Sequence, residues 1–563
     1  DGTSNESSMS LSSLFGRRNK SSNGLSELAR GLIEPPAPTG AGATRGGGAG
    51  SGVLRVPDRG RIEELNSSAI AGAVDTAAVD RVFSDSVELD NSAIVEFVRQ
   101  LCAVAKDELE APDGVRLFLL QKTVDVAYFN MGRIRLVWGR IWAILAAFLS
   151  DVGCHANPSV AHIAIDTIRQ LNMQALQKEE LANYNIQKEF LRPFEQIMAS
   201  SSSPAIREMV VACLRQIVLT RTAMIKSGWK GIFGVLSMAA SDEEEATVVS
   251  AFDLVETIIS GHFVQVAAFF TDSINCLMDF GRQVLYPQVA LKAIDFVHFW
   301  SRELAEGRVV AAAAECGSDG GGSEESGGRS PRRASADELA MKYWWPLLMG
   351  LSSLVSAQHL AVRTKALQVL FDVLKAYGVQ FSSEVWELIF RGVLFPMFDD
   401  VTHCDEPSLN TEWLKTTCLN ALRSLVELYS HYASGLFSLL PELLVLLANC
   451  ILQPNESLAR IGATCLSGLV EDNVDAFDPP RWALVVDRVE ALFDASLPRE
   501  LLEAGRASAA DTTDPPPLFD PPRVINKCVV QLLMINVAAS MGTLLVGKLG
   551  VETELRIVAC LTQ

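Results

Sequence analysis

Two short clusters combine residue types that can act as nucleophiles or metal ligands. Cys154 precedes His155, and His403 precedes Cys404 and Asp405. A thiolate beside an imidazole can attack a carbonyl group or coordinate zinc. Each cluster stands alone, however, without a second set of ligands at metal-binding spacing. We therefore interpret both as loop residues and predict no catalytic residue, no cofactor site and no metal site.

Phosphate-binding and acidic motifs lead to the same conclusion. The glycine run at residues 46–52 is not followed by the Lys-Ser or Lys-Thr pair of a P-loop, and it neither follows a strand nor opens a helix. The acidic run Asp242–Glu245 could bind a metal or a basic partner. Because it follows Ser241, we interpret Ser241 as a helix N-cap with acidic residues next to the positive end of the helix dipole.

The predicted helices that carry these residues follow an internal sequence repeat. A small residue, a large apolar residue, a polar residue, any residue and an apolar residue recur at Ala164–Ile168, Ala251–Val255 and Ala293–Val297. Looser copies begin at positions 212, 366, 418 and 465. Most intervals are close to the period of about 40 to 47 residues in HEAT and armadillo arrays. The sequence therefore predicts an all-α fold, a HEAT/armadillo-like α-solenoid of antiparallel helix pairs.

Segments rich in Gly, Ser and Pro divide this array. They are expected to stay flexible, because they cannot bury enough apolar surface to offset the loss of conformational entropy on ordering. The predicted organisation is a disordered leader at 1–65, a first HEAT-like block at 66–314, a flexible insertion at 315–337, a second HEAT-like block at 338–504, a Pro-rich linker at 505–522, and the start of a further, truncated helical repeat at 523–563.

Composition limits the function classes. The formal net charge is −19 and the isoelectric point is about 4.9, which argues against nonspecific nucleic-acid binding. Eleven cysteines without a Cys-x-x-Cys pair indicate reduced thiols in the cytosol. The apolar stretches 436–452 and 529–546 approach the length of a membrane span, but both contain polar residues. We expect core helices there.

Three groups of residues are candidates for contact or control. Arg133 and Arg140 lie seven apart on a predicted helix, and with Arg135 they form a candidate surface for a partner or an anionic membrane. An apolar stripe on another face of that helix is predicted to be buried. Its members are Ile134, Trp138, Ile141, Trp142 and Leu145.

The second group is predicted to form a helix junction. Pro193 opposes regular helix continuation, and the aromatic side chains around it can anchor a bend in apolar surface. These candidate repeat-junction residues are Phe190, Leu191, Pro193 and Phe194. The third group is the candidate phosphosite Ser335, which follows Arg332-Arg333-Ala334 and so suits a basophilic kinase.

Long ungapped blocks around these candidates resemble a known family. They are Asn130–Leu136 with Trp138 and Arg140–Trp142, Glu180–Asn183 with Gln187–Glu195, and Ser227–Lys230 with Ala239–Asp242. Together they closely resemble the large brefeldin-A-inhibited Arf guanine nucleotide exchange factors, in the homology regions downstream of the catalytic Sec-seven domain. The resemblance runs from about position 80 to 502.

The resemblance implies a function for this chain. Family members load Arf GTPases with GTP through a glutamate finger in the upstream domain, and no glutamate of this sequence corresponds to that finger. The chain is therefore expected to be a regulatory region rather than an enzyme, located in the cytoplasm and peripherally on trans-Golgi network and endosomal membranes, where it supports vesicle traffic.

The implied partners follow from the same resemblance. They are GTP-loaded Arf-family GTPases, with Rab-family GTPases as further candidates, the exchange domain of the same polypeptide, and the Golgi or endosomal membrane surface. A homodimer formed through regions outside this sequence is a further candidate, and no nucleic acid is expected. The alternative is a HEAT-repeat cargo or nuclear-transport adaptor that has no exchange domain.

Overall fold

All regular elements described by the structure are helices. The computed structural model describes residues 75–111, 115–133, 135–177, 186–318, 335–399, 411–501, 520–545 and 551–562. No strand occurs in these ranges, and the predicted all-α solenoid of helix pairs is confirmed. The predicted leader (1–65), most of the insertion (319–334) and most of the Pro-rich linker (505–519) lie outside the described residues. So do Ile134 and the His403–Cys404 pair.

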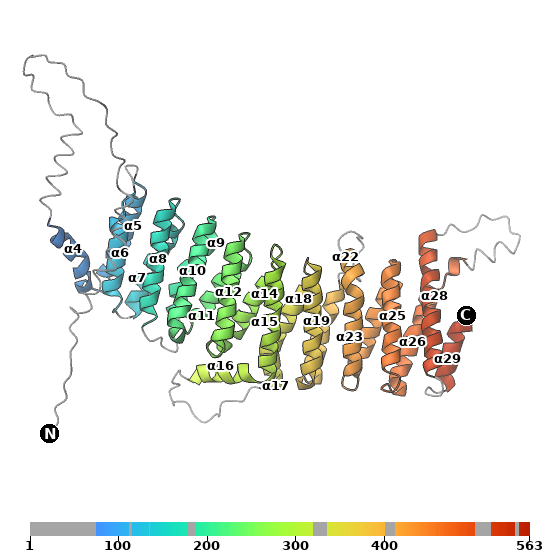
Figure 1. Cartoon of the computed structure of the whole chain (residues 1–563). Coiled ribbons are helices and arrows are strands. Elements are labelled where there is room, and N and C mark those ends of the chain that lie inside the picture. The colour runs from blue at the N-terminus through green and yellow to red at the C-terminus, as the bar shows by residue number, and fades with distance from the viewer. Residues whose placement is uncertain are drawn as a thin grey trace, which may run out of the picture. The chain divides into compact units, whose positions relative to one another are not determined.

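The chain divides into two compact units, with the boundary between Thr167 and Ile168, inside helix α8 (Pro158–Ala175). In the first unit, α5 packs against both α6 and α7, and α4 packs against α6 (Figure 1). The bounds of these elements are α4 Thr76–Ser84, η1 Asp85–Glu88, α5 Ala93–Leu109, α6 Phe118–Asn130 and α7 Arg135–Gly153.

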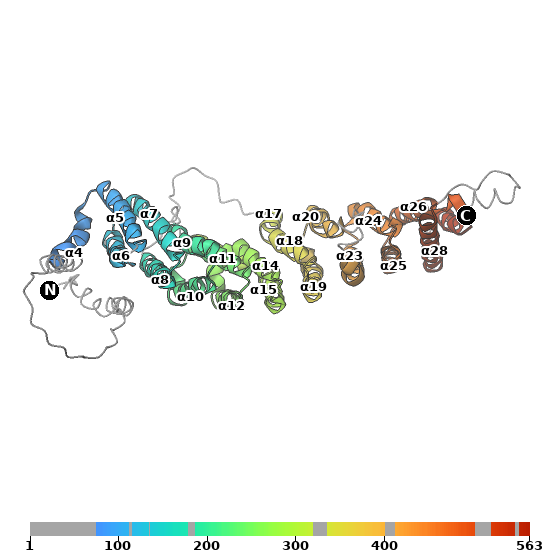
Figure 2. The same ribbon diagram turned by 90° about the horizontal axis from the view of Figure 1, so that it is seen from above.

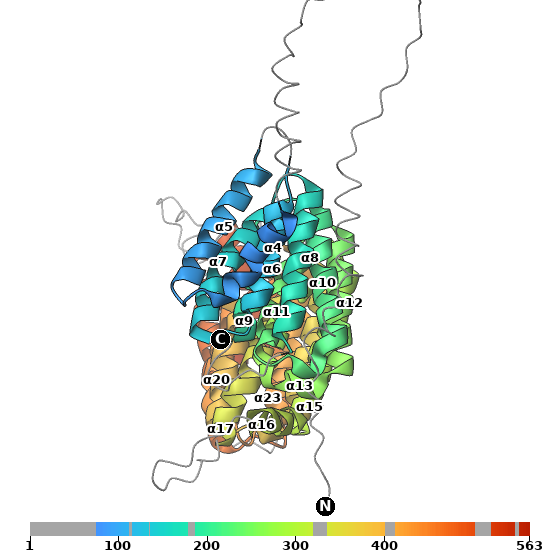
Figure 3. The ribbon, with the colours of Figure 1, turned by 90° about the vertical axis from the view of Figure 1, so that its left-hand side faces the viewer.

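In the second unit, the helices alternate between two layers (Figure 2). The first layer consists of α9 Ile186–Ser200, α11 Gly228–Ala240, α14 Phe270–Gly281, α18 Trp345–Leu354, α20 Ser383–Ile389 with η6 Phe390–Leu394, α24 Leu440–Leu452 and α26 Pro479–Ser496. The second layer consists of α10 Pro204–Arg221, α12 Glu245–Gly261, α15 Pro287–Ala305, α19 Leu360–Tyr377, α23 Leu419–His431, α25 Glu456–Asp472 and α28 Pro521–Leu544. Figure 3 shows α10 and α12 side by side in the second layer, where they pack against each other.

The repeated sequence motif explains this stacking. Ala251 and Ala293 are fully buried, and the large residues that follow them, Phe252 and Ile294, are at most 1% exposed. The polar residues of the same motif, such as Asp253, face outward. The small residue lets neighbouring helices approach while the large one fills the space between layers.

The array continues across the Gly/Ser-rich insertion. On either side of it, α14 packs directly against α18, and α15 packs directly against α19. Helix α16 (Arg308–Ser318) covers α13 (Phe263–Val266) and extends past the predicted start of the insertion at 315. It begins after Gly307, whose φ of 75° is a conformation that glycine adopts without strain.

Among the described residues, helices α7 and α28 are long and apolar enough to cross a membrane, judged by length and composition alone. The bent pair formed by α12 and α13–α14 also meets this criterion if it is counted as one span. Helix α28 begins at Pro521, inside the predicted linker, because proline suits the first turn of a helix. It packs against α25, α26 and α29 (Val551–Thr562), while Ile525 and Leu532 remain exposed.

Candidate partner-binding surfaces

The side chain of Arg133 forms hydrogen bonds to other residues of the first unit. Its guanidinium donates hydrogen bonds to the carbonyl oxygens of Ser86, Val87 and Leu89 at 3.1, 2.8 and 2.7 Å, and its Nε donates to Asn130 Oδ1 at 2.7 Å. The first two carbonyls belong to η1, and Leu89 is the residue that follows it. The prediction that Arg133 and Arg140 share a helix face is wrong, because α7 begins only at Arg135. Arg133 is a structural residue of this unit.

Helix α7 separates a buried face from an outer one. The predicted apolar stripe is confirmed where the structure describes it: Trp138, Ile141, Trp142 and Leu145 are at most 3% exposed. On the outside, Arg140 is exposed, Leu136 is 68% exposed, and Arg135 is half-buried. We define the α7 outer face as Leu136, Arg140, Ala143 and Ala147, which recur at helical spacing and are all exposed.

The predicted junction residues lie inside one continuous helix. Helix α9 runs through Pro193, so the predicted break at this proline is wrong. The apolar character of the group is nevertheless used, since Phe190, Leu191 and Phe194 are at most 3% exposed and Pro193 is also buried. Tertiary packing outweighs the local cost of proline here.

The packing partner of α9 is a row of glycines on α11. A Cβ atom added at Gly228 would lie 3.3 Å from Leu191 Cδ1, and one added at Gly231 would lie 3.1 Å from Leu191 Cβ. A Cβ atom added at Gly234 would lie 3.2 Å from Glu195 Oε1. The absent side chains therefore let α9 and α11 approach closely. Burial there raises the pKa of Glu195, although the charges of Lys188 and Arg192 oppose this rise.

Gln187 attaches the start of α9 to the start of α11. Its Oε1 accepts hydrogen bonds from the backbone N–H groups of Lys226 at 2.7 Å and Gly228 at 3.3 Å, and its Nε2 donates to Met224 O at 2.8 Å. Because this buried side-chain amide both donates and accepts hydrogen bonds, it fixes one arrangement of the two helices.

A part-buried ion pair joins α10 to the loop before α12. Arg207 donates to both carboxylate oxygens of Asp242, with an Nη2–Oδ1 distance of 3.0 Å, and to Ser201 O at 3.0 Å. Burial alone would raise the pKa of Asp242, but hydrogen bonds from Arg207 and from the Glu244 N–H, together with the arginine charge, hold that pKa below its usual value. The acidic run therefore includes a structural carboxylate that sequence reasoning missed.

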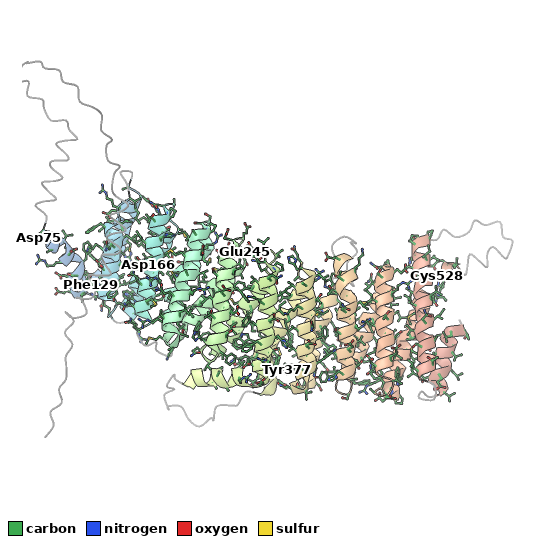
Figure 4. The ribbon with its side chains drawn as sticks, viewed as in Figure 1. Asp75, Phe129, Asp166, Glu245, Tyr377 and Cys528 are labelled. Atoms are coloured by element: carbon green, nitrogen blue, oxygen red, sulfur yellow. The ribbon has the colours of Figure 1, made fainter. Side chains whose placement is uncertain are left out.

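The predicted cap at Ser241 is wrong, because Ser241 ends α11 and Glu244 occupies the N-cap position of α12. The expected acidic residue in the first turn is present as Glu245. Figure 4 labels Glu245 at one edge of the second unit and Tyr377 at the opposite edge.

The edge marked by Glu245 carries further polar links between successive repeats. Gln283 Nε2 donates to Ala240 O at 2.8 Å, and His359 Nε2 lies 2.7 Å from Val284 O. We call these links the loop ladder. It consists of Arg207, Asp242, Gln283, His359, Arg363 and Glu412.

Arg363 repeats the geometry of Arg207. It is 4% exposed and donates to the carbonyl oxygens of Ala357 and Gln358 at 2.9 and 2.7 Å, and to Glu412 Oε1 at 2.9 Å. Like Arg207 in α10, it is the fourth residue of its helix. Each arginine therefore closes its own loop and reaches the next repeat.

The remaining reactive residue types form no metal cluster. Among the described residues, no group of three or more His, Cys, Asp or Glu side chains is arranged to hold a metal ion. Cys154 is exposed, and desolvation with the nearby Asp151 charge raises the pKa of its thiol. Burial raises the pKa of Cys276 and of Cys450 to about 12, so these thiols stay protonated.

Ser335 is exposed and lies at the start of α17 (Ala336–Leu339). Its position places the candidate phosphosite far from the α7 outer face in sequence.

Comparison with known proteins finds two family models and several relatives that are similar to parts of this chain. The family model described as "Mon2/Sec7/BIG1-like, HDS" matches residues 174–257, and the model "GBF1-like, tetratrico peptide repeat region" matches residues 344–466. The chain is 38% identical over 445 residues to brefeldin A-inhibited guanine nucleotide-exchange protein 1 of Homo sapiens, covering 78% of this chain and 23% of that protein.

Two further relatives agree with this match. Brefeldin A-inhibited guanine nucleotide-exchange protein 2 of Arabidopsis thaliana is 36% identical over 449 residues, covering 75% of this chain and 25% of the relative. The exchange factor SEC7 of Saccharomyces cerevisiae is 33% identical over 450 residues, covering 77% and 22%.

Over most of its length the chain is similar to large exchange factors of the BIG/Sec-seven type, in a region downstream of their catalytic domain. It spans about a quarter of the length of the curated relatives it matches. The first family model covers α9 to α11 and most of α12, which carry the glycine row and the Arg207–Asp242 pair. The α7 outer face lies before it.

Replacing Phe194 by alanine should destabilise the second unit strongly. The ring is fully buried, so the loss of its contacts and the resulting cavity should lower the free energy of unfolding by about 3 to 5 kcal/mol. Urea unfolding followed by tryptophan fluorescence measures this change. The exposed Lys188→Ala on the same helix is the matched control and should shift stability by less than about 0.5 kcal/mol. Equal effects of the two variants would contradict the packing described for α9.

Asp242→Asn should destabilise the chain at neutral pH and much less in acid. The lowered pKa of Asp242 means that its contribution is present above the unfolded value near pH 4 and is lost as pH falls through the folded pKa. We expect a loss of about 2 to 3 kcal/mol at pH 7, as for hydrogen bonds to charged groups.

The pH dependence of urea unfolding tests this sign. Glu243→Gln is the control, because that side chain is exposed and its replacement should change stability little at either pH. A difference between wild type and Asp242→Asn that stays constant from pH 7 to pH 3 would show that the ion pair does not carry the effect.

Proposed function

We propose that this chain is a regulatory helical region of a large Arf exchange factor, which binds GTP-loaded Arf at a membrane and controls the exchange domain of the same polypeptide. The identity of 38% over 445 residues with an Arf exchange protein is the observation that carries this proposal. The relatives favour it over the adaptor alternative. The proposed location is the cytoplasmic face of trans-Golgi network and endosomal membranes, with Rab-family GTPases and a homodimer as further candidate partners.

The α7 outer face is the proposed contact surface for the GTPase. Ala143 and Ala147 allow a partner to approach the helix closely, Leu136 offers an apolar anchor, and Arg140 can bind a carboxylate or phosphate through its planar fork. The formal charge of −19 opposes general attraction to anionic lipid. Recruitment therefore depends on a specific partner together with this local basic group.

Arg140→Glu should weaken recruitment without unfolding the chain. We expect binding to liposomes that carry GTP-loaded Arf to fall about tenfold, which corresponds to the loss of one charged contact. Liposome flotation measures this loss, and thermal unfolding should be almost unchanged because Arg140 is exposed.

The control for this experiment is Arg99→Glu, which makes the same charge change at an exposed position of helix α5. Equal losses for both variants would assign the effect to overall charge, and unchanged binding of Arg140→Glu would exclude the α7 outer face.

The chain alone should not catalyse exchange. In this family the resemblance assigns exchange to the Sec-seven domain, and this region lies outside it. Release of a fluorescent nucleotide from Arf, measured with the chain at catalytic concentration, should therefore proceed at the uncatalysed rate. Clear stimulation would contradict the assignment of a regulatory region.

A further inference from the structure

The two edges of the second unit differ in charge around α9 to α12. The edge that Glu245 marks in Figure 4 carries exposed carboxylates at Glu208 and at Glu243–Glu245. The opposite edge, marked by Tyr377, carries exposed cations where α9 and α11 begin. We call these cations the basic corner. They are Lys188, Arg192, Lys226 and Lys230.

The side chains of the basic corner come from neighbouring turns. Lys188 and Arg192 are four residues apart and so share one face of α9. Gln187, which precedes Lys188, accepts a hydrogen bond from the Lys226 N–H at 2.7 Å. The start of α9 therefore contacts the turn before α11, and Lys230 follows in the first turn of that helix.

Acidic side chains neutralise the basic corner only in part. Among the described residues, Glu189 lies 3.6 Å from Arg192, and Asp272 lies 4.0 Å from Lys230. Ion pairs of this length between exposed side chains are weak. A third carboxylate, Glu195, is half-buried, and burial raises its pKa. The corner therefore keeps a positive charge although the chain has a formal net charge of −19.

Exposed apolar side chains lie beside the basic corner, at turns of the same edge. Met224 in η2 (Thr222–Met224) is 45% exposed, and Val264 in α13 is 47% exposed. Helix α16 runs along this edge, across the direction of the stacked helices, and exposes Ala311 and Ala314 (Figure 1). Apolar tips flanked by cations suit a bilayer surface, where apolar groups enter the headgroup region and cations meet phosphates.

Charge distinguishes this edge from the opposite one. The edge marked by Glu245 also exposes an apolar side chain, Leu285, but anionic lipid would repel its carboxylates. We propose that the edge from α9 to α16 contacts a bilayer that contains anionic phospholipid, with the basic corner against the phosphates and with Met224 and Val264 in the headgroup region. This inference rests on the proposed membrane location, but it requires neither a GTPase nor the α7 outer face.

The negative charge of the whole chain does not prevent this contact. At physiological ionic strength, exposed charges farther apart than about 8 Å are largely screened from each other. Farther along the same edge, the end of α25 and the turn after it expose Glu471, Asp472 and Asp475, which anionic lipid would repel. The proposed contact is therefore limited to the part of the edge between α9 and α16.

Vesicle flotation of the full chain without any GTPase tests this contact. The chain should bind phosphatidylcholine vesicles only when they contain phosphatidylserine, and binding should fall as salt is added. Lys226→Glu combined with Lys230→Glu should weaken binding at least about tenfold, because each cation near an anionic surface contributes about fivefold. Thermal unfolding should be almost unchanged, since both side chains are exposed.

The matched control is Lys292→Glu combined with Lys415→Glu, which makes the same charge change at exposed positions nearer the opposite edge. This variant should bind like wild type. Equal losses for the two double variants, or equal binding of wild type with and without phosphatidylserine, would overturn the proposed contact.

Met224→Ser tests the apolar part of the contact at constant charge. It should weaken binding to phosphatidylserine vesicles about threefold or more, because an apolar group no longer enters the headgroup region. Unchanged binding of this variant would overturn the insertion of the turn between α10 and α11.

Vesicles that carry GTP-loaded Arf separate this inference from the proposed function. On such vesicles without phosphatidylserine, the Lys226 and Lys230 double variant should bind like wild type, whereas Arg140→Glu should bind weakly. On phosphatidylserine vesicles without Arf, Arg140→Glu should bind like wild type. A loss there as large as that of the double variant would overturn the assignment of lipid binding to this edge.

Discussion

Each helix pair of the second unit has an apolar face that only the next pair can cover. The buried alanines of the repeat motif set the distance between neighbouring helices, and the large residues after them fill the space. Burial of one such side chain as large as Phe252 contributes about 1.5 to 3 kcal/mol, so stability accumulates from repeat to repeat rather than from one central core. The glycine row of α11 is another form of this contact, because Leu191 packs where side chains would otherwise stand.

Polar groups complement this apolar stacking at the edge of the unit that carries the loop ladder. Apolar contacts alone leave neighbouring repeats free to slide, whereas Arg207 and Arg363 bind defined oxygens in their own loop and in the next repeat. Buried charges of this kind must be paired, and the pairing specifies one register. We propose that partners contact outward faces such as that of α7.

Sequence periodicity was sufficient to predict the array. The positions of Ala251 and Ala293 follow from the repeat, and both are buried as expected. The helices on either side of the one long interval in the repeat pack directly against each other. Local patterns of this type are readable because each repeat uses the same spacing.

Roles that depend on distant segments were not readable in the same way. Arg133 binds carbonyls more than forty residues away, and Asp242 binds an arginine thirty-five residues earlier. Pro193 is tolerated because α9 packs along α11, which a local rule does not contain. By contrast, Ser335 and Glu338 form a capping box by reciprocal hydrogen bonds between backbone N–H groups and side-chain oxygens, and this Ser-x-x-Glu spacing is a local signal that could have been found in the sequence.

We propose that the chain acts by binding a GTP-loaded Arf GTPase through the outside of α7. Hydrogen exchange of the chain with saturating soluble Arf, held once in its GTP state and once in its GDP state, tests this claim most directly. We expect slower exchange in residues 135–147 with the GTP form and no change there with the GDP form. Equal protection by both forms, or GTP-dependent protection confined to other helices, would contradict it.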